Sequence, residues 1–530
     1  MSTASNPPAQ DTVTHPAPIQ RGIPCISYSS GRRPAITRLL IAALLLAAPA
    51  FAADPTPDDA RAMKRFVDAL VIMQDRSADP IDLDQAFYGG AVPGLLRHLD
   101  PHSSFFDPGQ FEQLNQMQRS TSKGFGTVVS ILPGRVMVLQ TLPNTPSSRG
   151  GMMPGDEIRG VNNYRLDRLE PDQIVELLTE SRQKPVLLVV RHPGALRLEE
   201  LRLVPEQMQS PSVDRIFEMK PGIGYIRVSA FEGSTGRDIR AAIEKLGGQN
   251  LKGLVLDLRN NPGGLVTSAF EAASLFLKPG QVILTAKGRN VPETIERVAP
   301  NNTPYTFPVS VIVNGKTASA SEILTGALQD HDRAAVVGEP TFGKGLVQSV
   351  YPLAEKTGLA LTTALYYTAS GRSIQKPFRE EGFELGETAA HPNEQANFKT
   401  DKGRPIVGGG GIVPDVVVHP EGLTQFRAAL EASASFTTFA VEYIRDHKIT
   451  DGWEVTQETI DQFQIWLGER QIQPGMREWL RDRDYIESKL KEDIYTLTLG
   501  VEKGDEIVAQ RDPQVRQALD SVLNPPAFLQ

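Results

Sequence analysis

A lysine in a glycine-rich stretch is the first residue of this chain whose setting suggests chemistry. Residues 338–348 read GEPTFGKGLVQ, and the part that ends at Lys344 matches G-x-x-x-x-G-K, the opening of a phosphate-binding loop. Such a loop needs Ser or Thr directly after the lysine and a helix behind it, but Gly345 follows Lys344 and the next residues favour a strand. A nucleotide-binding enzyme that uses residues 338–344 is therefore an alternative hypothesis and not the leading one.

Three hydroxyl side chains precede a predicted helix and could supply a nucleophile. The stretch 309–330 reads as an apolar strand that ends near Asn314, then a run of small residues, then a helix with apolar residues at helical spacing. Free backbone N–H groups and the helix dipole at such a junction favour a developing negative charge. Thr317, Ser319 and Ser321 all fit this position, and each could equally serve only as the N-cap of the helix.

A serine nucleophile needs a base, which is usually histidine and in another known arrangement lysine. His331 falls in the charged turn QDHDR after the predicted helix, where we expect a solvated surface side chain. His102 lies far away in the sequence and stays open, so a histidine-based serine hydrolase is a further hypothesis. Lys344 could act as the base if burial lowers its pKa, and the glycines on either side allow a close backbone approach.

The stretch TASASEILTGALQDHDRAAVVGEPTFGKGLVQ resembles the carboxyl-terminal processing (tail-specific) protease family, whose members are serine peptidases with a Ser/Lys dyad. In that family a serine precedes the lysine by 25 positions and a glutamine follows it by four, as Ser319, Lys344 and Gln348 do here. The resemblance implies that Ser319 is the nucleophile, Lys344 the general base and later the general acid, and Gln348 the residue that orients Lys344. It also implies an oxyanion hole of backbone N–H groups from Ala320 and from Gly263 in the turn NNPGG.

Further blocks of the same family follow in family order, so the resemblance extends over most of the chain after the leader. These blocks are LDPHSSFF, GIGYIRVSAF, LVLDLRNNPGGL, YYTASGRSI and GGGIVPDVVV. Asp330 matches a position that is often acidic in the family, which implies a structural support rather than a catalyst.

The stretch KGFGTVV, followed by GMMPGDEIRGVNN, resembles a PDZ domain. Such domains bind an extended C-terminal peptide as an added strand and capture its carboxylate in a glycine-containing loop. The resemblance implies that this loop consists of Gly124, Phe125, Gly126 and Thr127.

The elements that must position these residues indicate an α/β multidomain protein. Strands alternate with helices over residues 222–420, which predicts an α/β core with parallel pairing. One helix of this core is expected to begin at a capping box of Thr235 and Asp238. The resemblance implies a crotonase/Clp-protease-like spiral for the core. The predicted order is a disordered leader plus signal peptide (1–53), an N-terminal helical region (54–115), a β-rich PDZ domain (116–205), the serine protease core (206–420) and a C-terminal helical region (421–530).

The N-terminus carries the pattern of a secretory signal peptide. Basic residues up to Arg38 precede the apolar run 39–53, and Ala50-Phe51-Ala52 is a small-x-small cleavage pattern. We therefore expect an exported, periplasmic protein cut near Ala52, with an uncleaved anchor and inner-membrane association as the alternative. The only cysteine, Cys25, precedes the predicted cleavage, so the mature chain would form no disulfide.

Composition limits the partners that the chain can have. The formal net charge is -8 and no long basic run occurs, so nucleic acid is an unlikely partner. No His, Cys, Asp and Glu cluster has ligand spacing, so we expect neither a metal nor a cofactor. The leading hypothesis is an exported serine endopeptidase that cuts proteins at or near their C-termini and binds their tails through the PDZ domain. A catalytically inactive PDZ scaffold is the alternative; an adaptor lipoprotein and a homo-oligomer are left open.

Overall fold

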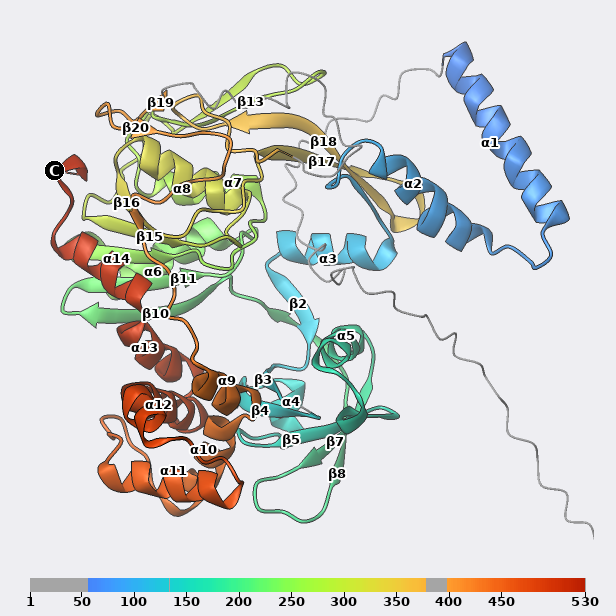
Figure 1. Cartoon of the computed structure of the whole chain (residues 1–530). Helices are drawn as coiled ribbons and strands as arrows, with labels where there is room; N and C mark the ends of the chain where they lie inside the picture. The colour runs from blue at the N-terminus through green and yellow to red at the C-terminus, as the bar shows by residue number, and fades with distance from the viewer. Residues whose placement is uncertain (1–55, 133, 378–397, 530) are drawn as a thin grey trace, which may run out of the picture. The chain divides into compact units, whose positions relative to one another are not determined.

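The computed structural model describes residues 56–132, 134–377 and 398–529 (Figure 1). The predicted leader and signal peptide, residues 1–53, lie outside the described residues. Within the described ranges, every helix is too short or too polar to cross a bilayer.

The N-terminal segment is mostly helical, as its apolar spacing predicts, and it ends beside the core. Helix α1 begins with Pro57 at its first position after a capping box of Thr56 and Asp59. Strand β1 pairs antiparallel with the core strand β18, with Ser104 opposite Ala360. The elements are α1 (Pro57–Arg76), a π-helical segment (Gln85–Ala91), α2 (Val92–Arg97), β1 (Ser104–Phe106) and α3 (Pro108–Gln118).

The next segment is a β-rich module around one antiparallel sheet. The sheet runs in the order β3-β4-β5-β7-β8 with β6 on β5, and β2 pairs with β9 where the chain enters and leaves the module. Helix α5 covers part of the sheet through Ile174, which is fully buried. The elements are β2 (Thr121–Gly124), β3 (Thr127–Leu132), β4 (Arg135–Thr141), α4 (Pro146–Arg149), β5 (Glu157–Val161), β6 (Tyr164–Arg165), α5 (Pro171–Ser181), β7 (Val186–Arg191), β8 (Glu199–Leu203) and β9 (Glu206–Gln209).

The core is built on a six-stranded sheet in the order β10-β11-β12-β15-β16-β21. Strands β10 and β11 are antiparallel, and the other neighbours are parallel, as strands that alternate with helices predict. The elements are β10 (Val213–Lys220), β11 (Ile223–Val228), α6 (Thr235–Leu246), β12 (Gly253–Asp257), α7 (Val266–Ser274), β15 (Val309–Val313), α8 (Ala320–Asp330), β16 (Ala334–Gly338) and β21 (Val416–Val417).

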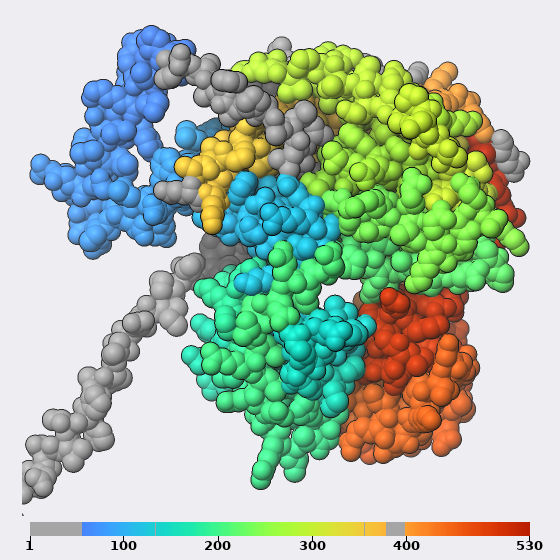
Figure 2. All heavy atoms as spheres, turned by 180° about the vertical axis from the view of Figure 1, so that it is seen from behind, coloured from blue at the N-terminus to red at the C-terminus, as the bar shows by residue number. Residues whose placement is uncertain are grey.

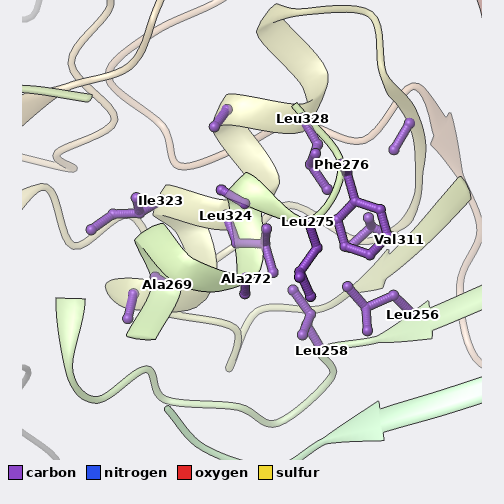
Figure 3. Close-up of a cluster of buried hydrophobic side chains, with 14 of the residues drawn as sticks. Leu256, Leu258, Ala269, Ala272, Leu275, Phe276, Val311, Ile323, Leu324 and Leu328 are labelled. Carbon is purple, nitrogen blue, oxygen red and sulfur yellow. The ribbon is translucent and has the colours of Figure 1, made fainter. Parts of the chain in front are cut away.

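Alternate residues of these strands bury opposite faces of the sheet. Leu256 of β12 and Val311 of β15 face α7 and α8, whose apolar sides close the main hydrophobic cluster (Figure 3). Val255 and Ile312, one position along, face the other side, where C-terminal helix α14 covers them. Burial on both faces explains why these strands are continuous apolar runs.

A second sheet of the core is antiparallel, and its strand β17 begins two positions after Lys344. Strand β18 pairs with β1, β13 and β17, and β14 pairs with β13. The elements are β13 (Val282–Lys287), β14 (Thr294–Arg297), β17 (Leu346–Pro352), β18 (Gly358–Tyr367), and the short pair β19 (Phe398–Lys399) and β20 (Pro405–Ile406).

The predicted helical character of the C-terminal region is confirmed. Its helices bury an aromatic cluster that includes Phe436 and Phe463, and α14 begins with Pro513 in its first turn. The elements are α9 (Gln425–Ala432), α10 (Ser435–Asp446), α11 (Gln457–Glu469), α12 (Met476–Leu499), α13 (Val501–Arg511) and α14 (Pro513–Leu523).

Two local predictions are wrong. Helix α6 has Ser234 as its N-cap; the Thr235 hydroxyl accepts instead from the Glu232 N–H at 2.7 Å, and Ser234 donates to Asp238 at 2.6 Å. The predicted solvated His331 is packed, because its side chain is only 7% exposed and bonds Asp401 at 2.7 Å. A neighbouring backbone N–H therefore takes the Thr235 hydroxyl, whereas a contact from a distant segment takes the His331 side chain.

Candidate active site

Ser319 stands at the junction of strand β15 and helix α8, where the sequence predicts a nucleophile. Its backbone has φ 55° and ψ −116°, a conformation that costs a residue with a side chain some free energy. The residue is only 1% exposed, and its hydroxyl has no hydrogen-bond partner among the described residues. A buried hydroxyl held in a strained turn without a structural partner is typical of a group kept for chemistry.

The two competing hydroxyls have structural partners. Thr317 Oγ1 donates to the Leu258 carbonyl oxygen at 2.9 Å. Ser321 Oγ donates to the Asn261 carbonyl oxygen at 3.1 Å. Of these three hydroxyls, only that of Ser319 has no hydrogen-bond partner among the described residues. This observation favours Ser319 as the nucleophile and does not depend on the spacing that the family resemblance uses.

Lys344 lies in the loop between β16 and β17 and is buried, with 5% of its surface exposed. Its Nζ donates to Gln348 Oε1 at 2.9 Å, and Gln348 Nε2 donates to the His102 carbonyl oxygen at 2.7 Å. Burial lowers the pKa of Lys344 to about 8, against the opposing charges of Asp100 and Glu322. A pKa near 8 leaves roughly a tenth of Lys344 neutral at pH 7 and about half at pH 8, and the neutral form is what a lysine base requires.

Glu322 connects the candidate nucleophile to the candidate base and was missed in the sequence. Its fully buried carboxylate accepts the backbone N–H groups of Ser319 at 2.8 Å, Gly343 at 2.7 Å and Lys344 at 2.9 Å. It also accepts the Thr341 hydroxyl at 2.5 Å. Burial raises the pKa of Glu322, and these four donors oppose that rise. The pattern Ser-x-x-Glu, which is a capping-box pattern, was the available signal.

Tyr366 of β18 adds a second link between the same two segments. Its hydroxyl donates to the Lys344 carbonyl oxygen at 2.8 Å and lies 3.2 Å from the Ser319 carbonyl oxygen. The relative positions of Ser319 and Lys344 are thus held through their backbones, which leaves both side chains available for reaction.

The turn 260–264 lies against the start of α8, as an oxyanion hole requires. A Cβ atom on Gly263 would come within 2.7 Å of the Ala318 oxygen and 2.9 Å of the Ala320 nitrogen. The Ala320 N–H has no partner among the described residues. The Gly263 N–H, however, donates to Asn261 Oδ1 at 2.9 Å, so it is occupied in this conformation.

Three other polar residues that the sequence raised, Asp330, His331 and His102, have different surroundings. Asp330 binds the buried Arg372 at 2.8 Å and accepts the Ser370 N–H at 2.8 Å. His331 bonds Asp401 and the Val282 carbonyl oxygen. His102 lies close enough to Lys344 for the two charges to interact, and burial lowers the pKa of His102 to about 4. A histidine that is such a weak base is a poor general base.

Residues 338–344 do not have the geometry of a phosphate-binding loop. Lys344 is followed by strand β17, not by a helix. The N–H groups of Gly343 and Lys344, which would have to cradle a phosphate, donate to the Glu322 carboxylate, whose charge would repel an anion.

In the β-rich module, the loop at residues 124–127 borders a groove of about 280 Å³. The N–H groups of Phe125 and Gly126 have no partner among the described residues, whereas the carbonyl groups of both accept bonds from the chain. Gly126 has φ 77°, and a Cβ atom there would lie 2.3 Å from the Thr145 side chain. The groove is mostly apolar, with Val129 and Leu188 among its lining side chains. Free N–H groups at the end of an apolar groove suit a peptide carboxylate.

Comparisons with known proteins identify both the module and the core. The profile of Peptidase family S41 matches residues 222–385, and the PDZ domain profile matches residues 114–191. The carboxy-terminal-processing protease of Bartonella bacilliformis is 32% identical over 340 residues, which are 60% of this chain and 78% of that protein. The chain belongs to the carboxy-terminal processing proteases. It is therefore a serine-type peptidase with a PDZ domain, and the predicted α/β fold and enzyme class are confirmed.

Other carboxy-terminal processing proteases are also similar. The chloroplastic carboxyl-terminal-processing peptidase 2 of Arabidopsis thaliana is 34% identical over 316 residues, 57% of this chain and 59% of that protein. The solved structure of a photosystem II D1 C-terminal processing protease is 26% identical, has a TM-score of 0.37, and the match covers 69% of this chain and 89% of that one. The predicted domain limits stay a prediction.

Proposed function

We propose that this protease cleaves protein substrates at or near their C-termini with Ser319 as nucleophile and Lys344 as base. The observation that carries the proposal is the Glu322 carboxylate, which accepts the backbone N–H groups of both Ser319 and Lys344. The Ser319 hydroxyl has no partner among the described residues, and Lys344 is buried with a lowered pKa. A lysine that loses its proton readily can accept the serine proton at moderate pH.

The proposed reaction follows from these roles. The Ser319 oxygen attacks the scissile carbonyl carbon while its proton passes to the neutral Nζ of Lys344. The oxyanion that forms is stabilised by the Ala320 N–H together with an N–H of the turn 260–264. The C–N bond then breaks, the leaving amine takes the proton from Lys344, and a water molecule hydrolyses the acyl-enzyme by the same route in reverse. Gln348 keeps Lys344 in place throughout.

One rearrangement is part of this proposal. The Ser319 hydroxyl makes no hydrogen bond in the described structure, and Lys344 Nζ donates to Gln348. A change of side-chain rotamer must therefore bring the two reacting atoms together when substrate binds. Active-site hydrogen bonds are commonly looser without substrate and tighten in the complex.

The PDZ groove would select the substrates. We propose that the loop of residues 124–127 binds the terminal carboxylate of a substrate through the N–H groups of Phe125 and Gly126, and that the apolar groove takes its last side chains. We further propose export to the periplasm after cleavage near Ala52. Amino-terminal sequencing of the mature protein tests the export part, because an intact leader would contradict it.

The direct test uses labelled β-casein and the variants Ser319→Ala and Lys344→Ala. We expect both variants to lose cleavage by at least about 10³-fold, since removal of a nucleophile or its base commonly costs that much. Equal cleavage by wild type and Ser319→Ala would exclude Ser319 as nucleophile. Wild type without activity on any unstructured protein would favour the inactive scaffold.

A further inference from the structure

We propose that the turn at residues 100–103, here called the Asp100 turn, is a positioning element of the peptidase site that orients Gln348 and sets the basicity of Lys344. The proposal rests on the proposed function of Lys344 as the base. The Asp100 turn precedes the PDZ domain and lies outside both matched profiles. Its His102 carbonyl oxygen nevertheless accepts a hydrogen bond from Gln348, which lies 246 positions later in the chain.

The Asp100 carboxylate builds the turn. Its Oδ1 accepts the N–H groups of His102 and Ser103, both at 2.7 Å, and its Oδ2 accepts the Ser103 hydroxyl at 2.6 Å. Asp100 is buried, so its charge acts in a region that water screens poorly. One carboxylate therefore both shapes the turn and places a negative charge inside the protein.

The turn is fastened to the core on its C-terminal side. Ser103 Oγ accepts the Thr362 N–H of β18 at 3.1 Å, and strand β1 continues the pairing directly afterwards. Phe106 packs in a cluster with Val350 and Ala360. Figures 1 and 2 show this segment beside the end of the β17–β18 hairpin, far from it in sequence.

The contact with Gln348 fixes which end of its amide faces the lysine. The His102 carbonyl oxygen can only accept, so it holds the NH₂ group of Gln348. The amide oxygen must then point the other way, toward Lys344 Nζ, to which it is bonded. Without this acceptor the amide could turn over and present two donors to the lysine. The Asp100 turn thus decides whether Gln348 can orient the base.

Several charged or titratable groups surround Lys344. The carboxylates of Asp100 and of Glu322, on α8, both stabilise its protonated form and oppose the effect of burial. His102, whose pKa burial and Lys344 lower to about 4, is neutral at the pH of interest. Tyr366, on β18, is also neutral, because burial raises its pKa well above the usual value. Lys376 donates to the carbonyl oxygen of Thr341, three positions before Lys344. Among the described residues, Asp100 is therefore one of the two carboxylates that favour the protonated form of Lys344.

The test is the pH dependence of kcat/KM on labelled β-casein for Asp100→Asn. The asparagine oxygen can still accept both backbone N–H groups, so the variant removes the charge and largely keeps the turn. We expect the acid limb to move to lower pH by about half to one unit, since one carboxylate that favours the ammonium form is gone. At pH 6.5 the activity relative to the variant's own alkaline plateau would rise about three- to eightfold. The matched control is Asp107→Asn, which changes an exposed N-cap carboxylate of the same segment.

The orienting role is tested by Ser103→Ala, which removes the hydroxyl that joins Asp100 to Thr362 but leaves both charges. We expect the alkaline plateau of kcat to fall several-fold with no shift of the acid limb, and thermal melting to show that each variant is folded. If the alkaline plateau of kcat is the same in Ser103→Ala as in the wild type, the orienting role is overturned. Coincident limbs for wild type, Asp100→Asn and Asp107→Asn overturn the electrostatic role. A wild-type profile without an acid limb, or activity that survives in Lys344→Ala, contradicts the proposed function instead.

Discussion

Glu322 holds the backbone of Lys344 from 22 positions earlier in the chain, with its carboxylate 2.9 Å from the Lys344 nitrogen. The same carboxylate accepts the Ser319 N–H at 2.8 Å. The proposed nucleophile, at a helix N-terminus, and the proposed base, in a loop, are thereby both held by one buried carboxylate. Small errors in such relative placement are costly for catalysis, because the reacting atoms must come within hydrogen-bond distance.

Replacement of Glu322 by Gln should therefore impair catalysis. The amide can accept only through one atom, so its NH₂ group would face backbone donors that now have no acceptor. We expect the alkaline plateau of kcat/KM to fall about 10- to 100-fold. The acid limb should also move to lower pH, because the Glu322 charge raises the pKa of Lys344. Activity profiles of Glu322→Gln and of the exposed control Glu296→Gln provide the measurement. A Glu322→Gln profile that matches the control would remove the shared carboxylate from the mechanism.

The pH profile of the wild type follows from the titration of Lys344. In the proposed mechanism the neutral form of Lys344 is the base, so activity should be low below the pKa and rise through about pH 8 to a plateau. A histidine base would instead give a limb near pH 6.5 or below. Lys344→Arg, which stays protonated, should lose at least about 10³-fold at every pH. A flat wild-type profile from pH 6 to 9 would contradict a lysine base.

The sequence was enough to select the residues of the proposed dyad but not the contacts that hold them. Ser319, Lys344 and Gln348 lie within one stretch with fixed spacing, so a local pattern is enough to select them. The strands of the core were equally visible, because burial on both faces leaves apolar runs such as residues 253–256. These features depend on neighbours in the chain.

The contacts that the sequence did not reveal come from distant segments. The His102 carbonyl oxygen reaches Gln348 across 246 positions, and a backbone atom leaves no trace in residue types. His331 is packed because Asp401 and the β13 backbone meet it, although its neighbours in sequence are charged.

Gly263→Ala tests how closely the turn 260–264 supports the nucleophile. The added Cβ would lie 2.7 Å from the Ala318 oxygen and 2.9 Å from Ser319 Cβ, and φ is 100°. We expect at least about a 100-fold loss in kcat, as for removal of one oxyanion-hole donor. The control is Gly280→Ala, which has a similar positive φ of 81° but open space around the added carbon. If both variants lose activity to the same small extent, backbone strain alone explains the effect and the close approach to Ser319 has no role.

Gly126→Ala tests the predicted carboxylate loop of the PDZ domain. Its Cβ would lie 2.3 Å from the Thr145 side chain, so the loop must move and its free N–H groups would lose their alignment. In a Ser319→Ala background, which prevents cleavage, we expect a fluorescent peptide with a free C-terminus to bind at least about tenfold more weakly than to the parent. Gly151→Ala, with φ 83° and open space, is the matched control and should bind as the parent does. The same peptide with an amidated C-terminus should bind weakly to all three proteins, because it lacks the charge that the loop N–H groups attract. Equal binding of the free and amidated peptides by the parent would show that the groove does not recognise a terminal carboxylate.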